Sequence, residues 1–130
     1  MKLSEFRKKY NLHDSPINGL SYFPEQGRLI MGVAICDDGQ QWPTQIQERL
    51  REDGMNPLPL NLVFTGVPYY SVSPGTLDFE NDEINHERLL PSRKPGKEMI
   101  EFCLLTTSKW GTEGVRFLRI EAEGVDWDLS

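Results

Sequence analysis

Histidine and cysteine are scarce in this sequence, with two of each in 130 residues. A structural zinc site needs about four such ligands at regular spacing, and neither His13 nor His86 has a suitable neighbour pattern. Nucleophile signatures such as GxSxG and phosphate loops such as GxxxxGK[ST] or GxGxxG are also absent. We therefore expect no metal, no cofactor and no catalytic residue, which favours a protein that is not an enzyme.

Long apolar runs are lacking as well. The longest, such as Leu58 to Phe64, fall far short of the roughly 20 residues that cross a bilayer, so we expect no membrane association. Charges throughout the first ten residues argue against a secretory signal, and we predict a cytoplasmic protein. Cys36 and Cys103 each lie in an apolar run, and we expect them to be reduced, buried and inert.

Positive charge is in the minority. Fourteen basic residues face 20 acidic ones, for a formal net charge of −6. This balance opposes binding to phosphate backbones, so nucleic acid is an unfavoured partner. The same charge would steer a basic protein toward this one.

Period-two alternation of apolar residues dominates the sequence and predicts strands. The predicted strands are Ile17–Phe23 and Leu29–Ile35 around a Pro24–Gly27 turn, one long or kinked strand from Leu58 to Val72, and a closing pair at Glu98–Thr107 and Gly114–Gly124. Val125, Trp127 and Leu129 either extend the last strand or add another. The polar, proline-containing stretch from Ser73 to Lys97 is predicted to be the main loop, with a short strand at most at Thr76–Phe79.

Helical spacing appears in two places. Leu3, Phe6 and Tyr10 fall on one face of a predicted N-terminal helix, with Ser4 as its cap. The segment from Trp42 to Asp53 suits either a helix or a strand, and Pro43 favours the helix. Together these patterns predict one domain over residues 1–130. Its fold class is α+β, mainly antiparallel β as a sandwich or strongly curved sheet, with an N-terminal helix and one further helix.

His13, Asp14 and Ser15 stand between the predicted helix and the first strand. Aspartate and serine side chains close turns through local hydrogen bonds, and Pro16 biases Ser15 toward extended backbone. Either ring nitrogen of His13 can tie the end of the helix to a neighbouring strand. We therefore interpret the three residues as a structural joint, in preference to a metal-dependent hydrolase site.

An acidic stretch and several large aromatic residues are the candidates for contact with a partner. The stretch from Asp78 to Glu83 has side-chain oxygens at alternate positions, as calcium-binding loops do. It lacks the glycine and the glutamate that the twelve-residue calcium loop requires. We interpret it as a solvated acidic loop. Exposed aromatic residues favour interfaces. The predicted partner-binding residues are Tyr69, Tyr70, Asp78, Glu80, Asp82, Glu83 and Trp110.

The joint Leu12-His13-Asp14-Ser15 fits a pattern [FL]-H-D-[SA]. Followed by the strand Ile17–Phe23, a later LVFTGV strand at Leu62–Val67 and a closing hairpin, it resembles small bacterial proteins that are immunity proteins of polymorphic toxins or are uncharacterised. The resemblance implies a cytoplasmic protein that binds and neutralises a bacterial toxin without catalysis, and an acidic inhibitor suits a basic toxin domain.

Two other functions remain open on the sequence. A sheet curved around a pocket lined by Phe64, Tyr69 and Phe102 would bind a small molecule. A metal-dependent hydrolase using His13, Asp14 and His86 would require these side chains to meet in one cleft. The sequence does not decide whether His13 and His86 come together.

Overall fold

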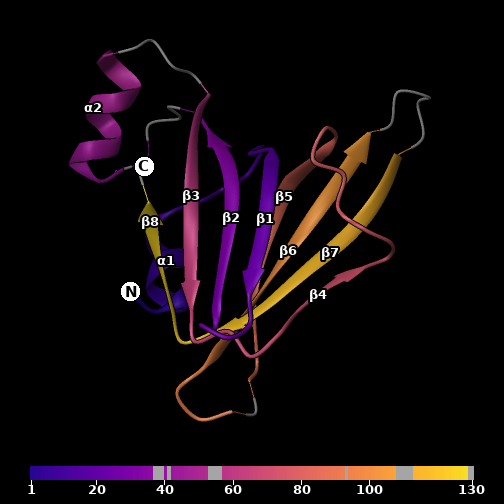
Figure 1. Cartoon of the computed structure of the whole chain (residues 1–130). Helices are drawn as coiled ribbons and strands as arrows, with labels where there is room; N and C mark the ends of the chain where they lie inside the picture. Colours follow the sequence, from indigo (N-terminus) through magenta and orange to yellow (C-terminus); the bar gives the residue numbers. More distant parts are fainter. Residues whose placement is uncertain (37–39, 41, 53–56, 93, 108–112, 129–130) are drawn as a thin grey trace.

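Eight strands form two antiparallel sheets in the computed structural model, which describes residues 1–36, 40, 42–52, 57–92, 94–107 and 113–128. One sheet has the order β1-β2-β3-β8 and the other the order β4-β7-β6-β5 (Figure 1). The first contains β1 (Ile17–Phe23), β2 (Arg28–Ile35), β3 (Leu58–Thr65) and β8 (Gly124–Asp128). The second contains β4 (Tyr70–Ser73), β5 (Asp82–Leu90), β6 (Glu98–Thr107) and β7 (Glu113–Ala122). The predicted α+β, mainly antiparallel β class is confirmed.

Two hairpins form where alternation predicted them. In the first, Phe23 of β1 pairs with Arg28 of β2, and Gly27 supplies the left-handed backbone of the turn at φ 62°. In the second, β6 and β7 pair along their whole length, from Glu98–Ala122 to Thr107–Glu113. The predicted hairpins are confirmed, because both strands of each pair carry an inward apolar row.

The predicted strand from Leu58 to Val72 is wrong as a single strand. β3 ends at Thr65, and Gly66 (φ 63°) turns the chain so that it crosses to the other sheet as β4. The Val67 N–H then donates to the Gly27 carbonyl at 2.8 Å. β8 likewise leaves the sheet of β7 and pairs with β3, so the two sheets converge at the lower end of Figure 1 and separate toward the upper end.

The strand β5 lies in the stretch that we predicted to be a loop. Its inward positions hold Asp82 and Glu87 beside Ile84, so the apolar alternation that marks a strand is missing. A bulge between Ile84 and His86 also changes which alternate residues of the strand point inward, so no single alternation runs along β5. The short strand suggested at Thr76–Phe79 does not form.

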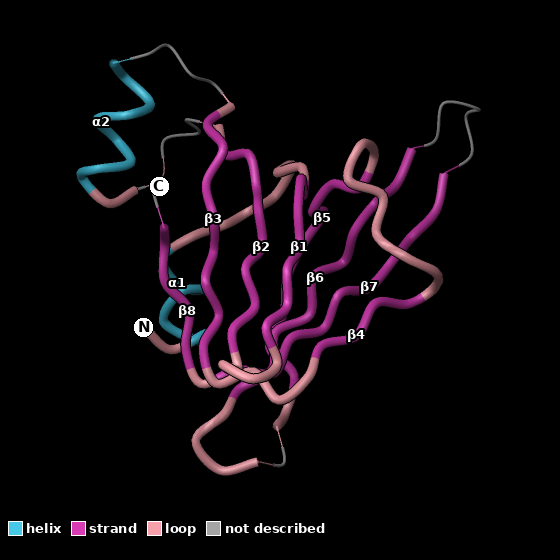
Figure 2. Tube along the Cα trace, in the orientation of Figure 1, coloured by secondary structure: helices cyan, strands magenta, loops and turns pink. Residues whose placement is uncertain are grey.

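Both helices follow their predicted apolar faces. Helix α1 (Leu3–Lys9) buries Leu3 and Phe6, although Lys2 and not Ser4 is its N-terminal cap residue. Helix α2 (Thr44–Glu52) resolves the ambiguous segment in favour of a helix. The tube view separates the two helices from the strands and shows α1 beside β8, against which it packs together with β5 and β6 (Figure 2). No helix in the described parts of the chain is long and apolar enough to cross a membrane.

The core lies between the facing surfaces of the sheets and extends under both helices. Strands contribute buried residues such as Met31, Phe64 and Phe102. Four aromatic side chains, from α1, the residue that follows it, the segment before α2 and β8, join at one end of the core. The ring centroids of contacting pairs are 5.1–5.8 Å apart. They are Phe6, Tyr10, Trp42 and Trp127. Trp42 and Trp127 are therefore packing residues and not exposed contact residues.

Candidate functional site

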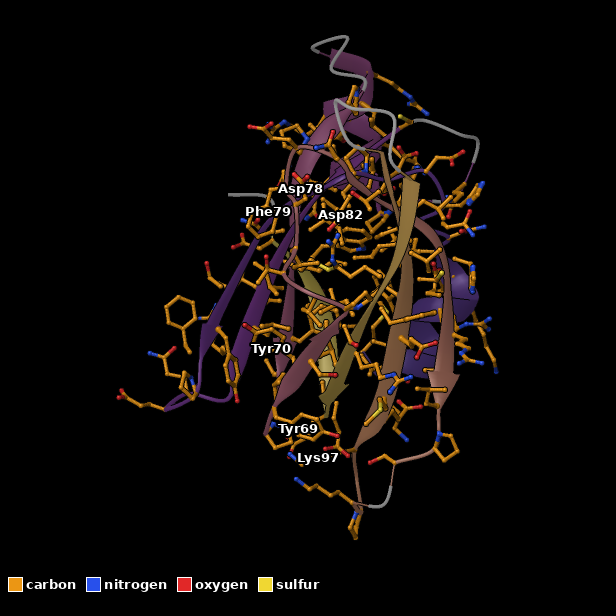
Figure 3. All side chains as sticks on the ribbon, turned by 90° about the vertical axis from the view of Figure 1, so that its right-hand side faces the viewer. Tyr69, Tyr70, Asp78, Phe79, Asp82 and Lys97 are labelled. Carbon is orange, nitrogen blue, oxygen red and sulfur yellow. The ribbon has the colours of Figure 1, made fainter. Side chains whose placement is uncertain are left out.

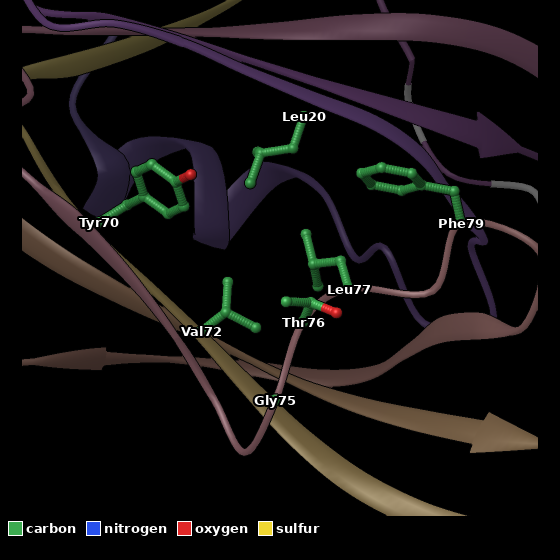
Figure 4. Close-up of a pocket in the computed structure, with 7 residues that line it drawn as sticks. All are labelled: Leu20, Tyr70, Val72, Gly75, Thr76, Leu77 and Phe79. Carbon is green, nitrogen blue, oxygen red and sulfur yellow. The ribbon is translucent and has the colours of Figure 1, made fainter.

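A hollow opens between β1 and β4, each of which is one of the two edge strands of its sheet. Its volume is about 420 Å³, and Figure 4 shows the side chains that surround it. Leu20 comes from β1, Tyr70 and Val72 come from β4, and the remaining lining residues come from the segment after β4. The lining residues are Leu20, Tyr70, Val72, Gly75, Thr76, Leu77 and Phe79. We call this site the β1–β4 hollow.

The wall of the β1–β4 hollow is apolar and partly solvated. Leu20, Val72 and Leu77 are half-buried, whereas the Phe79 ring is 45% exposed. Tyr22 and Tyr70 meet edge to face at 5.3 Å where β1 and β4 lie close. An apolar hollow that keeps exposed aromatic surface is suited to burying a side chain from a partner.

An ion pair holds the segment after β4 in place. The Arg116 guanidinium donates to both carboxylate oxygens of Asp82 at 2.8 and 3.0 Å, and its Nε donates to the Pro74 carbonyl at 3.0 Å. The Asp78 backbone N–H donates to Asp82 Oδ2 at 2.8 Å. Both ends of the segment are therefore tied to one buried carboxylate, so the hollow is formed before any partner arrives.

An acidic turn adjoins the hollow. Asp78 accepts hydrogen bonds from the Asn81 amide at 2.7 Å and the Glu80 N–H at 3.0 Å. These bonds hold the pKa of Asp78 below its usual value, so this carboxylate stays ionised well into acid. Glu80 and Glu83, in the same stretch, are exposed acidic residues.

The structure separates the predicted partner-binding residues into groups. Figure 3 places Asp78, Phe79 and Asp82 toward the upper end, and Tyr69 and Lys97 toward the lower end. Tyr70 lines the β1–β4 hollow, whereas the Tyr69 ring is 45% exposed and lies 5.7 Å from Lys94 Nζ.

Other predicted residues have different places. Asp82 is buried and supports the fold through Arg116, so it does not offer a free carboxylate. Trp110 lies outside the described residues. Phe64 and Phe102, expected to line a pocket, are fully packed in the core instead.

His13, Asp14 and Ser15 form the joint after α1. The His13 ring donates through Nδ1 to the Asn85 carbonyl of β5, and its Nε2 lies 3.3 Å from Asp14 Oδ2. Asp14 adopts a left-handed backbone at φ 65°, a conformation that aspartate tolerates better than most residues. Both ring nitrogens of His13 are therefore engaged within the protein.

His13 and His86 line one cleft between α1, the joint and β5. The cleft has a volume of about 410 Å³, and we call it the histidine cleft. His86 Nδ1 accepts a hydrogen bond of 3.1 Å from the Asn85 side-chain amide. The lining residues are Arg7, Tyr10, Asn11, His13, Asn85, His86 and Glu87. Among the described residues, no group of three or more His, Cys, Asp or Glu could hold a metal ion.

Glu87 is a notable residue that the sequence did not single out. The residue is 9% exposed, and among the described residues its Oε2 has no hydrogen-bond partner. Burial raises the pKa of Glu87, and a hydrogen bond from the Leu12 backbone N–H opposes that effect only in part. A glutamate within a charged stretch looks like a surface residue in sequence, so no pattern distinguished it.

The two cysteines differ in environment. Cys103 is buried, and burial raises the pKa of its thiol, so it stays protonated and inert. Cys36 is exposed, which contradicts the expected burial. It directly follows Ile35, the last residue of β2, and so lies outside the strand.

Comparison of the chain with models of known protein families, with curated protein sequences and with solved structures finds no match in any of the three. A function for this chain therefore has to be argued from its own residues.

Proposed function

We propose that this protein is a non-enzymatic, cytoplasmic binding protein that neutralises a bacterial toxin, as an immunity protein does. The proposal is that a segment of the toxin docks in the β1–β4 hollow. The observation that carries it is an apolar hollow, formed in advance between two edge strands and bordered by an acidic turn.

The shape of the hollow supports a protein segment as its occupant. Its volume of about 420 Å³ is enough for one or two large side chains. Rigid walls lower the entropy cost of binding, and the Arg116–Asp82 ion pair supplies that rigidity. An edge strand also presents unpaired backbone groups that an extended segment can use.

Charge supports a basic partner. Asp78 and Glu80 flank Phe79, which lines the hollow, and the exposed Glu83 follows in the same acidic stretch of a chain of net charge −6. Complementary charges speed association, and they disfavour acidic competitors. We therefore propose a basic toxin domain that presents an apolar side chain flanked by lysine or arginine.

The proposal is tested with Val72→Glu, which places a charge in the hollow. A toxin encoded beside the gene for this chain would be co-expressed with each variant, and cell survival and Kd would be measured. We expect Val72→Glu to weaken binding by about 100-fold or more, since it buries an unpaired carboxylate in the contact.

Val115→Glu is the matched control. Val115 is 46% exposed and projects from β7, away from the hollow lining. The Val115→Glu variant should bind the toxin and protect cells from it as well as the wild-type protein does. Equal Kd values for the two variants, or a toxin that the wild-type protein fails to bind, would contradict the proposal.

Small-molecule binding is the alternative that the same hollow favours, because pockets of roughly 300–1,000 Å³ suit such ligands. An apolar fluorescent probe would distinguish the two. Two results together would favour the alternative. A small molecule would displace the probe saturably, and Val72→Glu would have no effect on toxin neutralisation.

A further inference from the structure

The histidine cleft contains several hydrogen-bond donors that the fold holds in position but does not use. Arg7 Nε donates to the Glu87 backbone carbonyl at 3.2 Å. This bond fixes the guanidinium at the cleft while its two terminal nitrogens have no protein partner among the described residues. Each of these terminal nitrogens, Nη1 and Nη2, carries two N–H groups that can donate hydrogen bonds to a ligand.

Asn11 is held in the same manner. Its Oδ1 accepts a hydrogen bond of 2.9 Å from the His13 N–H, and its backbone N–H and carbonyl both bond to the Gln40 side chain. With its oxygen engaged, the Asn11 side chain offers the cleft its amide hydrogens.

The tautomer of His86 adds a third donor. Because His86 Nδ1 accepts from the Asn85 amide, the proton of the neutral ring resides on Nε2. His13 differs, since Asn85 and Asp14 occupy both of its nitrogens. His86 is thus the histidine that can donate to a ligand.

From these contacts we propose that the histidine cleft binds a small oxyanion, the phosphate or carboxylate group of a ligand, through Arg7, Asn11 and His86. Donors that lack acceptors select an acceptor-rich ligand, and a charged donor favours an anion. The site lies apart from the β1–β4 hollow, with which it shares no lining residue.

Local charge agrees with an anionic ligand despite the net charge of the chain. Arg7 is followed by Lys8 and Lys9, which line an adjoining hollow that shares Tyr10 with the cleft. The nearby carboxylates are engaged or covered, because Asp14 faces His13 and Glu87 Oε2 is buried.

The test is a titration of the isotope-labelled protein with inorganic phosphate at constant ionic strength, followed by NMR. We expect saturable shifts of the amides of residues 85–87 and of the Arg7 Nε–H. Arg7→Gln should weaken binding about ten-fold or more, the value of one charge-assisted hydrogen bond. His86→Ala should weaken it as well, which gives a second variant if the first is unstable.

Lys8→Gln is the matched control. It removes the same charge as Arg7→Gln, one residue further along the chain, but the Lys8 side chain does not line the cleft. It should change the affinity less than about two-fold, because screened surface charges act weakly. A parallel titration with acetate distinguishes a carboxylate ligand from a phosphate ligand. The absence of saturable shifts with both anions, or equal weakening by Arg7→Gln and Lys8→Gln, would overturn the proposal.

Discussion

Two buried glutamates in the same sheet show how the surroundings of a side chain decide its chemistry. Burial tends to raise the pKa of Glu101, but hydrogen bonds from Arg119 at 2.6 Å and Arg88 at 2.7 Å outweigh burial and lower it. Glu87 lacks such partners, and its pKa is raised. Glu101 therefore stabilises the fold as an anion, whereas Glu87 is accommodated best as the neutral acid.

Glu87→Gln should change how stability depends on pH. A raised pKa in the folded state means that stability is fully present below the pKa of the unfolded chain and is lost as pH rises through the folded pKa. We expect the variant to unfold with a free energy about 1 kcal/mol higher than wild type at neutral pH, since it carries no buried charge. The difference should vanish in acid, as measured by urea unfolding across pH.

Glu83→Gln provides the comparison, because Glu83 is an exposed glutamate in the same strand. The free energy of unfolding of the Glu83→Gln variant should depend on pH in the same way as that of the wild-type protein. A Glu87→Gln curve that runs parallel to wild type over the whole range would show that burial of Glu87 carries no cost.

At the scale of elements, the segment between β4 and β5 depends on a single ion pair. Asp82 begins β5 and its side chain is fully buried, so its charge needs a partner. Arg116, on β7, supplies that partner and also reaches the Pro74 carbonyl after β4. One arginine thus connects three strands and shapes one wall of the β1–β4 hollow.

Arg116→Met should destabilise the protein by about 3 kcal/mol, since it leaves the buried Asp82 carboxylate without a counter-charge. Thermal and urea unfolding would measure the loss. Arg88→Met is the control, because Arg88 is more than half exposed and Glu101 retains Arg119. We expect it to cost about 1 kcal/mol or less.

A double variant sharpens this test. Asp82→Asn combined with Arg116→Met removes both charges and should cost less than the sum of the single changes. Additive losses would mean that the ion pair does not couple the two strands.

At the scale of the whole molecule, two sheets that converge at one end and separate at the other leave edge strands exposed. β2, β3, β6 and β7 each have a strand on both sides, whereas β1 and β4 are edges beside the hollow. The interior strands also carry most of the buried apolar residues. Stability should therefore be uneven across the fold.

Hydrogen exchange would measure this difference. We expect the amides of β4 to exchange well before those of its neighbour β7, since β4 is short and hydrogen-bonded on one side only. On the proposed function, a toxin segment bound in the β1–β4 hollow should slow exchange in β1, β4 and residues 75–79. Uniform protection in the free protein, or slowing confined to other strands, would contradict this account of the molecule.

Local patterns in the sequence determined much of the architecture. Alternation identified both hairpins, and helical spacing identified α1, because each of these elements buries one regular apolar face. At α2 the spacing suited a helix and a strand equally. Pro43 correctly favoured the helix at α2. These features depend on neighbours in the chain, which a sequence displays directly.

Only the tertiary structure decided the remainder. β5 pairs with β6 although two of its inward residues are carboxylates. Their partners, Arg116 for Asp82 and the Leu12 N–H for Glu87, come from distant parts of the chain. The same holds for the β1–β4 hollow, whose walls join when Gly66 turns the chain from one sheet to the other. His13 and His86 line one cleft for a similar reason, since Asn85 bonds to both rings. Contacts between residues far apart in sequence carry no local periodicity, so the sites they create appear only when the chain is folded.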